Sequence, residues 1–139
     1  MTKKLSLSIL IIIAAITMSF AGVNLNEGKW EITSKIEMPG LPVQMPPSTY
    51  TQCITKEDMV PKSKQSGQNC EHLDVKVKGN TVTWVMKCTD ANGTTTGNGT
   101  MTYNGDTFSG VINMKINNPG QPEMTMINKM VGKRIGSCD

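Results

Sequence analysis

The 139-residue chain has little that could carry chemistry: one histidine, four cysteines without a C-x-x-C pair, and two each of tryptophan, tyrosine and phenylalanine. Zinc and iron–sulfur sites need clustered cysteine or histidine ligands, so no metal site is expected. A nucleophilic side chain needs a base, and the single histidine, His72, is expected on a solvated strand face beside Asp74. Phosphate-loop and dinucleotide fingerprints are missing. The sequence therefore predicts a non-enzymatic protein without a cofactor.

Clustered positive charge is also missing. The chain carries 14 Lys and Arg against 11 Asp and Glu, and Lys133-Arg134 is the one adjacent basic pair outside the N-terminus. Nucleic-acid binding needs a basic stripe along the phosphates or a platform of aromatic side chains. Nucleic acid is therefore not an expected partner.

The one long apolar run lies at the N-terminus, where Lys3 and Lys4 precede the residues from Leu5 to Ile16. It is shorter than the roughly 20 residues that a membrane-spanning helix needs. Ser19 and Ala21 are small residues suited to a cleavage site before Gly22. The sequence predicts a signal peptide over residues 1–21 and a single periplasmic or secreted domain over 22–139, with no membrane span after cleavage; an uncleaved anchor is the alternative.

The remaining chain alternates apolar and polar residues between three turn signals: Gly79-Asn80, Asn92-Gly93 and Asn104-Gly105. Glycine and asparagine tolerate the positive φ of tight hairpin turns. With two-residue turns and a five-residue loop over 117–121, an apolar row crosses five strands through Val75, Trp84, Met101, Phe108 and Met130. The polar residues of the same strands then share the other face.

This pattern predicts an all-β fold: a single curved antiparallel meander sheet of about seven strands, open or partly closed like a barrel. The first two strands are expected at 29–37 and 49–54. Thr55 is a candidate cap for one short helix that ends before Pro61.

The four cysteines indicate two disulfides in an oxidising compartment. Cys88 is expected opposite Glu71, within one residue of Cys70, so a bulge would allow Cys70–Cys88 and leave Cys53–Cys138. The alternative pairing joins Cys53 to Cys70 and Cys88 to Cys138.

Three glycines, Gly97, Gly99 and Gly110, fall on neighbouring positions of the expected inner face. Their missing side chains would leave a depression, and apolar pockets with few polar groups are typical of small-molecule sites. The candidate ligand-binding residues are Trp84, Met86, Gly97, Gly99, Met101, Phe108, Gly110, Ile112, Met126 and Asn128. Alternatively, the glycines permit sheet curvature, or Trp30 fills the gap.

The stretch "EMPGLPVQMPPSTYTQC", residues 37–53, contains four prolines and several apolar side chains. Proline fixes φ and favours an extended chain before it. We expect Met38, Leu41, Val43 and Met45 to fold over an open end of the sheet as a cover. Nine methionines follow residue 21, and thioethers bind Cu(I), but packing on the inner face accounts for five of them.

Three segments, "GKWEITSKIEMPGLPVQMPPSTYTQC", "GNTVTWVMKC" and "GKRIGSCD", resemble domain-of-unknown-function family 3617, a family of exported bacterial proteins. The resemblance extends from Gly28 to Cys138. It implies a small periplasmic or secreted protein with no assigned activity. A second likeness concerns Gly28-Lys29-Trp30 and Arg134, which are similar to the Gly-x-Trp and arginine at the base of lipocalin barrels; otherwise Trp30 is a core residue.

Two functions follow as expectations. The first is a binding protein that holds an apolar small molecule or lipid-like group between the sheet and the proline-rich cover. The second is an envelope structural or interaction protein with a filled core and an unknown protein partner. A methionine-based Cu(I) binder ranks below both.

Overall fold

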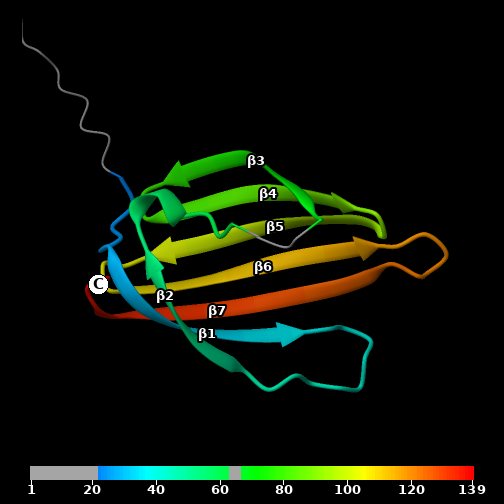
Figure 1. Ribbon diagram of the computed structural model, residues 1–139, viewed down its shortest axis with the longest axis horizontal. Helices are drawn as coiled ribbons and strands as arrows, with labels where there is room; N and C mark the ends of the chain where they lie inside the picture. The colour runs from blue at the N-terminus through cyan, green and yellow to red at the C-terminus, as the bar shows by residue number, and fades with distance from the viewer. Residues whose placement is uncertain (1–21, 63–66) are drawn as a thin grey trace, which may run out of the picture.

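The computed structural model describes residues 22–62 and 67–139, and the expected signal peptide lies outside this part of the chain. Seven antiparallel strands form one open, curved sheet, in the order β2-β1-β7-β6-β5-β4-β3 (Figure 1). The strands are β1 (Gly28–Glu37), β2 (Ser48–Ile54), β3 (Asn69–Lys78), β4 (Thr81–Asp90), β5 (Gly93–Tyr103), β6 (Thr107–Asn117) and β7 (Met124–Gly136). The predicted all-β meander is confirmed.

The expected short helix is a single 3-10 turn, η1 (Lys56–Asp58), which follows β2 directly. The Asp58 carboxylate accepts hydrogen bonds from the Thr55 backbone N–H at 3.2 Å and the Thr55 hydroxyl at 3.0 Å. In the described residues, no helix is long and apolar enough to cross a membrane.

The strand registers differ from the prediction by two residues at three of the four connections. Trp84 lies opposite Gly99 rather than Met101, Met101 opposite Gly110 rather than Phe108, and Phe108 opposite Gly132 rather than Met130. A shift of two residues keeps every side chain on its face, because the side chains of a strand alternate. Trp84 and Phe108 are accordingly both buried on the inner face.

Two turns account for part of these shifts. The second hairpin turns over Ala91-Asn92, and the Asp90 carboxylate accepts hydrogen bonds from the backbone N–H groups of Asn92 and Gly93. In the third hairpin, Gly105 is paired with the N-terminal segment: its N–H donates to the Asn24 carbonyl at 2.7 Å. Asn24 lies about 80 residues earlier in the chain, and the acceptor in the second hairpin is the Asp90 side chain. The composition of the turns alone indicates neither interaction.

The β3–β4 ladder contains a shift of one residue, which changes the face of the side chains. Next to the turn, the pairing is as predicted, with Lys78 opposite Thr81. An irregularity between Leu73 and Lys76, where Asp74 has a φ of 50°, then brings His72 opposite Met86. The predictions that Val75 faces Trp84 and that His72 lies on the solvated face are therefore wrong: Val75 is 48% exposed, and His72 is on the inner face.

Glycines line the inner face diagonally, and a large neighbour fills the space above each. A Cβ atom at Gly99 would collide with the Trp84 indole, one at Gly110 with Met101, and one at Gly132 with the Phe108 ring. The predicted depression above Gly99 and Gly110 is thus filled. Trp30 does not fill it, since Trp84 and Met101 do so from the adjacent strands.

Two segments cover the half of the inner face nearest the β5–β6 turn. Val23 and Leu25 of the N-terminal segment are buried in the core, as is Ile54 at the end of β2. Met59 and Val60, after η1, pack against the same cluster. This half, which we call the aromatic half, holds the side chains of Trp30, Ile32, Met101, Tyr103, Phe108 and Met130.

The proline-rich segment does not act as a cover, and that prediction is wrong. It forms the β1–β2 connection at one end of the sheet (Figure 1). Leu41 is 50%, Val43 71% and Met45 42% exposed, and Met38 is half-buried. The segment before β1, the end of β2 and the residues after η1 cover the sheet instead.

The preferred disulfide pairing is confirmed. Cys70 and Cys88 lie directly opposite each other on β3 and β4 and are bonded. Cys53 on β2 is bonded to Cys138, 85 residues further along the chain. The second bond ties the edge strand β2 to the chain end that follows β7.

Candidate functional site

A cleft of about 290 Å³ lies over the aromatic half of the sheet. Its floor is made by inner-face side chains of four adjacent strands, and its wall by β2, η1 and the chain after η1. The lining residues are Ile32, Met101, Tyr103, Phe108 and Met130 on the floor, and Tyr50, Gln52, Ile54, Asp58, Pro61 and Lys62 on the wall. The volume is close to the lower end of the range for small-molecule sites, about 300 Å³.

The floor is rigid because its rings pack on one another. The Phe108 ring lies 5.5 Å from Trp30 and 5.7 Å from Tyr103 between ring centroids, both in tilted arrangements. Such aromatic pairs contribute about 0.5–1.5 kcal/mol beyond their buried area. Trp30 is completely buried, so the aromatic group is anchored below the cleft and does not rearrange freely.

Tyr103 connects the floor to the covering segment. Its hydroxyl donates a hydrogen bond of 2.6 Å to the Met59 carbonyl. Burial, together with the nearby Asp58 carboxylate, raises the pKa of Tyr103 to about 12. Tyr103 therefore remains a neutral donor across the physiological range and holds the segment after η1 in place.

Charged groups lie on the cleft wall, not on its floor. The Asp58 carboxylate is held by Thr55, whose backbone and side-chain hydrogen bonds lower the pKa of Asp58, with a smaller effect from Lys62. The Lys62 ammonium lies 3.7 Å from Asp58. On β2, partial burial raises the pKa of Tyr50. The cleft thus combines an apolar interior with a polar edge.

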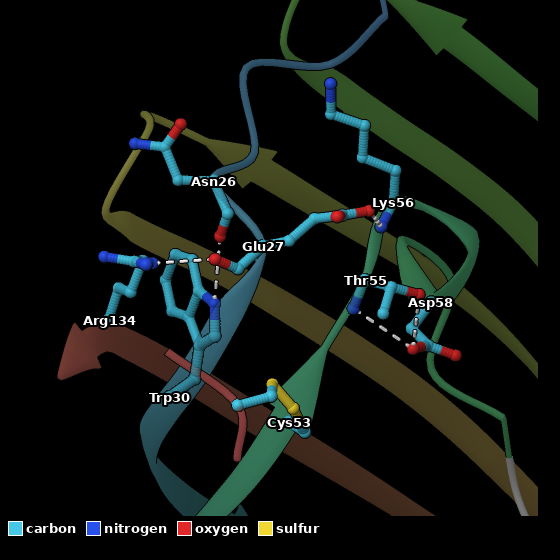
Figure 2. The surroundings of a disulfide bond; sticks show 9 residues. Asn26, Glu27, Trp30, Cys53, Thr55, Lys56, Asp58 and Arg134 are labelled. Carbon is cyan, nitrogen blue, oxygen red and sulfur yellow. Dashed lines mark hydrogen bonds between the residues drawn. A yellow bond between two sulfur atoms is a disulfide. The ribbon is translucent and has the colours of Figure 1, made fainter. Parts of the chain in front are cut away.

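A hydrogen-bond network fixes the N-terminal end of β1 beside this cleft (Figure 2). The Trp30 indole N–H donates to the Asn26 carbonyl at 3.2 Å, and Arg134 Nε donates to the Glu27 carbonyl at 2.8 Å. Trp30 and Arg134 are themselves opposite each other on β1 and β7. The Glu27 side chain accepts a hydrogen bond from the Lys56 backbone N–H at 2.9 Å, which joins the N-terminal segment to η1.

Gly28 allows Arg134 to reach the backbone. A Cβ atom at Gly28 would lie 2.6 Å from Arg134 Nε and would also overlap the Gly136 carbonyl. Only glycine fits this close approach. The Gly-x-Trp and arginine elements, far apart in the sequence, therefore form one structural unit at the end of the sheet.

Only two of the ten predicted ligand-binding residues line the cleft: Met101 and Phe108. Trp84 is buried above Gly99, and Ile112 and Met86 are buried core residues. Met126 and Asn128 are half-buried in the other half of the inner face, where Asn128 Oδ1 accepts a 2.6 Å hydrogen bond from Ser34. The sites at Gly97, Gly99 and Gly110 are occupied by neighbouring atoms.

The sequence reasoning missed the whole β2 wall and the segment after η1. Tyr103 and Ile32 could have been found, because both continue the apolar alternation of their strands. Tyr50, Gln52 and Lys62 carried no such signal, since β2 is exposed along nearly all of its length and its position opposite β1 follows from tertiary contacts.

The chain matches the protein family described as "Protein of unknown function (DUF3617)" over residues 25–138. This match covers nearly all of the described domain, and the chain belongs to this family. No curated protein matches the chain. No solved structure matches it either.

Proposed function

We propose that this protein is a non-enzymatic, exported binding protein that holds a small apolar molecule, or the apolar end of a lipid-like one, in the cleft over the aromatic half. The cleft itself is the observation that carries the proposal: about 290 Å³ with a floor of Ile32, Met101, Phe108 and Met130. A preformed apolar floor loses little conformational entropy when a ligand binds.

The polar edge supports an amphipathic ligand. Gln52, Asp58 and Lys62 stand on the wall, so a ligand with an apolar body and a polar end satisfies both surfaces at once. The Tyr103–Met59 hydrogen bond holds the wall at a fixed distance from the floor.

Export is part of the same proposal. Two disulfides leave no free cysteine in the described residues, and such bonds persist in oxidising compartments. Together with the basic and apolar N-terminus, they support processing of residues 1–21 and a periplasmic or secreted location. N-terminal sequencing of protein purified from its own host tests this, with Gly22 as the expected first residue.

The test of the cleft is direct binding of a fluorescent apolar probe, N-phenyl-1-naphthylamine, with Gln52→Trp as the blocking variant. Gln52 is exposed on the wall, so an indole at this position can lie on the apolar floor without disturbing the core. Burial of its apolar surface favours that arrangement. We expect probe binding by the wild type and at least about a tenfold loss of affinity in Gln52→Trp.

Thr49→Trp is the matched control. It adds the same side chain to β2, but Thr49 is not among the cleft residues and pairs with Thr33 on β1. We expect its probe affinity to equal that of the wild type. Absence of probe binding to the wild type, or equal loss in both variants, would contradict the cleft as a binding site and favour the envelope interaction protein.

A further inference from the structure

The two edges of the open sheet differ in how they are protected against pairing with another chain. The β3 edge contains the irregularity between Leu73 and Lys76, with a φ of 50° at Asp74. It also carries charged side chains along its length: Glu71, Asp74, Lys76 and Lys78. Bulges and charges are the devices by which natural sheets keep an edge from recruiting a further strand. The β3 edge is therefore protected.

β2, at the other edge, has none of these devices. Its sequence, STYTQCI, contains no charge and no proline, and it pairs with β1 in one continuous register from Gly28–Ile54 to Ser34–Ser48. Every β2 residue except Ile54 is exposed. In the described part of the chain, no strand pairs with the far side of β2. Its outward backbone N–H and C=O groups can therefore form a second ladder.

We propose that β2 is a dimerisation edge, which pairs antiparallel with β2 of a second copy of this chain. The two-fold axis passes beside Thr51, so that Thr51 lies opposite Thr51 of the second copy. The other facing pairs, each formed twice, are Tyr50 with Gln52, Thr49 with Cys53, and Ser48 with Ile54. The result is one continuous sheet that extends across both copies.

Charge favours a second copy as the partner. A two-fold axis brings each side chain of the edge near its own symmetry mate, and like charges opposite each other destabilise a strand pair. β2 has no charge to repel itself. Lys29 and Asp139, which line a small cavity beside Cys53, have opposite signs. Self-pairing therefore brings no like charges together within the ladder.

The flanking residues restrict the ladder to the length of β2. Pro46 and Pro47 precede Ser48, and proline has no N–H to donate. After Ile54, the chain turns into η1. A segment that is centred on Thr51 and bounded on both sides can pair completely with itself. The pairing uses both unprotected edges, so the assembly closes at two copies.

The interface is small, which sets the expected affinity. Standard interfaces use about 20–30 residues from each partner, more than β2 supplies. Tyr50 and Met45, which are 41% and 42% exposed, add apolar surface at this edge. We expect a dissociation constant of about 10 μM. Because backbone groups form the ladder, Tyr50 and Gln52 keep their places on the cleft wall, and the inference does not depend on the ligand proposed for the cleft.

The experiment measures dimerisation of the disulfide-intact protein by sedimentation equilibrium, with Thr51→Lys and Thr51→Glu as variants. Thr51 is exposed on the outer face of β2, so neither change disturbs the core. Each variant places like charges opposite each other at the two-fold axis, and we expect at least about a tenfold loss of affinity. An equimolar mixture of the two variants places opposite charges there. Native mass spectrometry of this mixture should show more heterodimer than random pairing gives.

Thr100→Lys is the matched control. It makes the same substitution at an exposed threonine, but on β5, which lies between β4 and β6 inside the sheet. We expect its dimerisation to equal that of the wild type.

Amide hydrogen exchange of the wild type decides the proposal without a variant. Between concentrations well below and well above the dissociation constant, exchange of β2 amides should slow, whereas exchange at the β3 edge should not change. A wild type that remains monomeric would overturn the proposal and leave the β2 edge to a strand of another protein. Equal affinities of the wild type and Thr51→Lys, or random pairing in the mixture, would overturn it as well.

Discussion

The two halves of the inner face share one packing feature, but they are covered to different extents. In both, a glycine sits beneath a large side chain: Gly132 beneath Phe108 in the aromatic half, and Gly99 beneath Trp84 in the other half. The aromatic half is then closed by two covering segments and a hydrogen bond from Tyr103, whereas Met114 and Met126 remain half-buried. One half is therefore preorganised around a fixed cavity, and the other is adaptable.

Each half also has its own disulfide. Cys53–Cys138 lies beside the aromatic half, near Trp30 and η1 (Figure 2), and Cys70–Cys88 crosses the β3–β4 ladder next to His72. The first spans 85 residues and the second 18. The Cys53–Cys138 bond, which lies near the cavity, therefore restricts the unfolded chain more strongly than the Cys70–Cys88 bond does.

The largest expected effect comes from removing these bonds separately. In the chain-entropy relation, a separation of 85 residues corresponds to about 4.5 kcal/mol and one of 18 to about 3 kcal/mol. We expect Cys53→Ala/Cys138→Ala to lose more free energy of unfolding in urea than Cys70→Ala/Cys88→Ala. An equal or reversed order would show that local packing, not loop length, controls the two contributions.

The next effect tests the filled glycine positions. Gly132→Ala places a Cβ against the Phe108 ring, which Trp30 and Tyr103 hold in place. Overpacking of this kind costs about 2–3 kcal/mol, measured by thermal or urea unfolding. Gly136→Ala is the control on the same strand, because nothing lies within 4 Å of its Cβ position. A neutral Gly132→Ala would mean that the ring moves freely.

The smallest effect concerns the bond that fixes the cavity wall. Tyr103→Phe removes the hydrogen bond to Met59 and should cost about 1 kcal/mol at pH 7. Because folding raises the pKa of Tyr103 to about 12, its contribution is complete below the ordinary tyrosine pKa, about 10, and is lost as the pH rises through 12. Urea unfolding at pH 8 and pH 11 should therefore show a smaller difference between wild type and Tyr103→Phe at the higher pH. A constant difference would contradict this assignment.

The sequence predicted which side chains of β4 to β7 lie on the inner face and which on the outer face. It did not predict most of the residue pairs that lie opposite each other on neighbouring strands. Trp84, Met101 and Phe108 fall on one face because alternation determines sides, and errors of two residues preserve them. The partners depend on turn lengths, and Gly105 shows why these were missed: its backbone pairs with Asn24, about 80 residues earlier in the chain.

The candidate site was predictable only in part. Met101 and Phe108 were identified from the apolar row, but the wall of the cleft consists of β2 residues, most of them exposed, with η1 and the segment after it. Exposed polar residues such as Gln52 carry no periodic signal. The proline-rich segment had an apolar composition that suggested a cover, but its rigid backbone forms the exposed β1–β2 connection.

The sequence by itself determined the all-β class and which side chains of β4 to β7 share a face, because alternation acts over short distances; it preferred the disulfide pairing that the structure has, but left a second pairing open. The tertiary structure alone decided which segments cover the sheet, where the cleft lies, and that His72 points to the inner face. These depend on contacts between distant parts of the chain and on one extra residue in β3, which reverses the side chains beyond it.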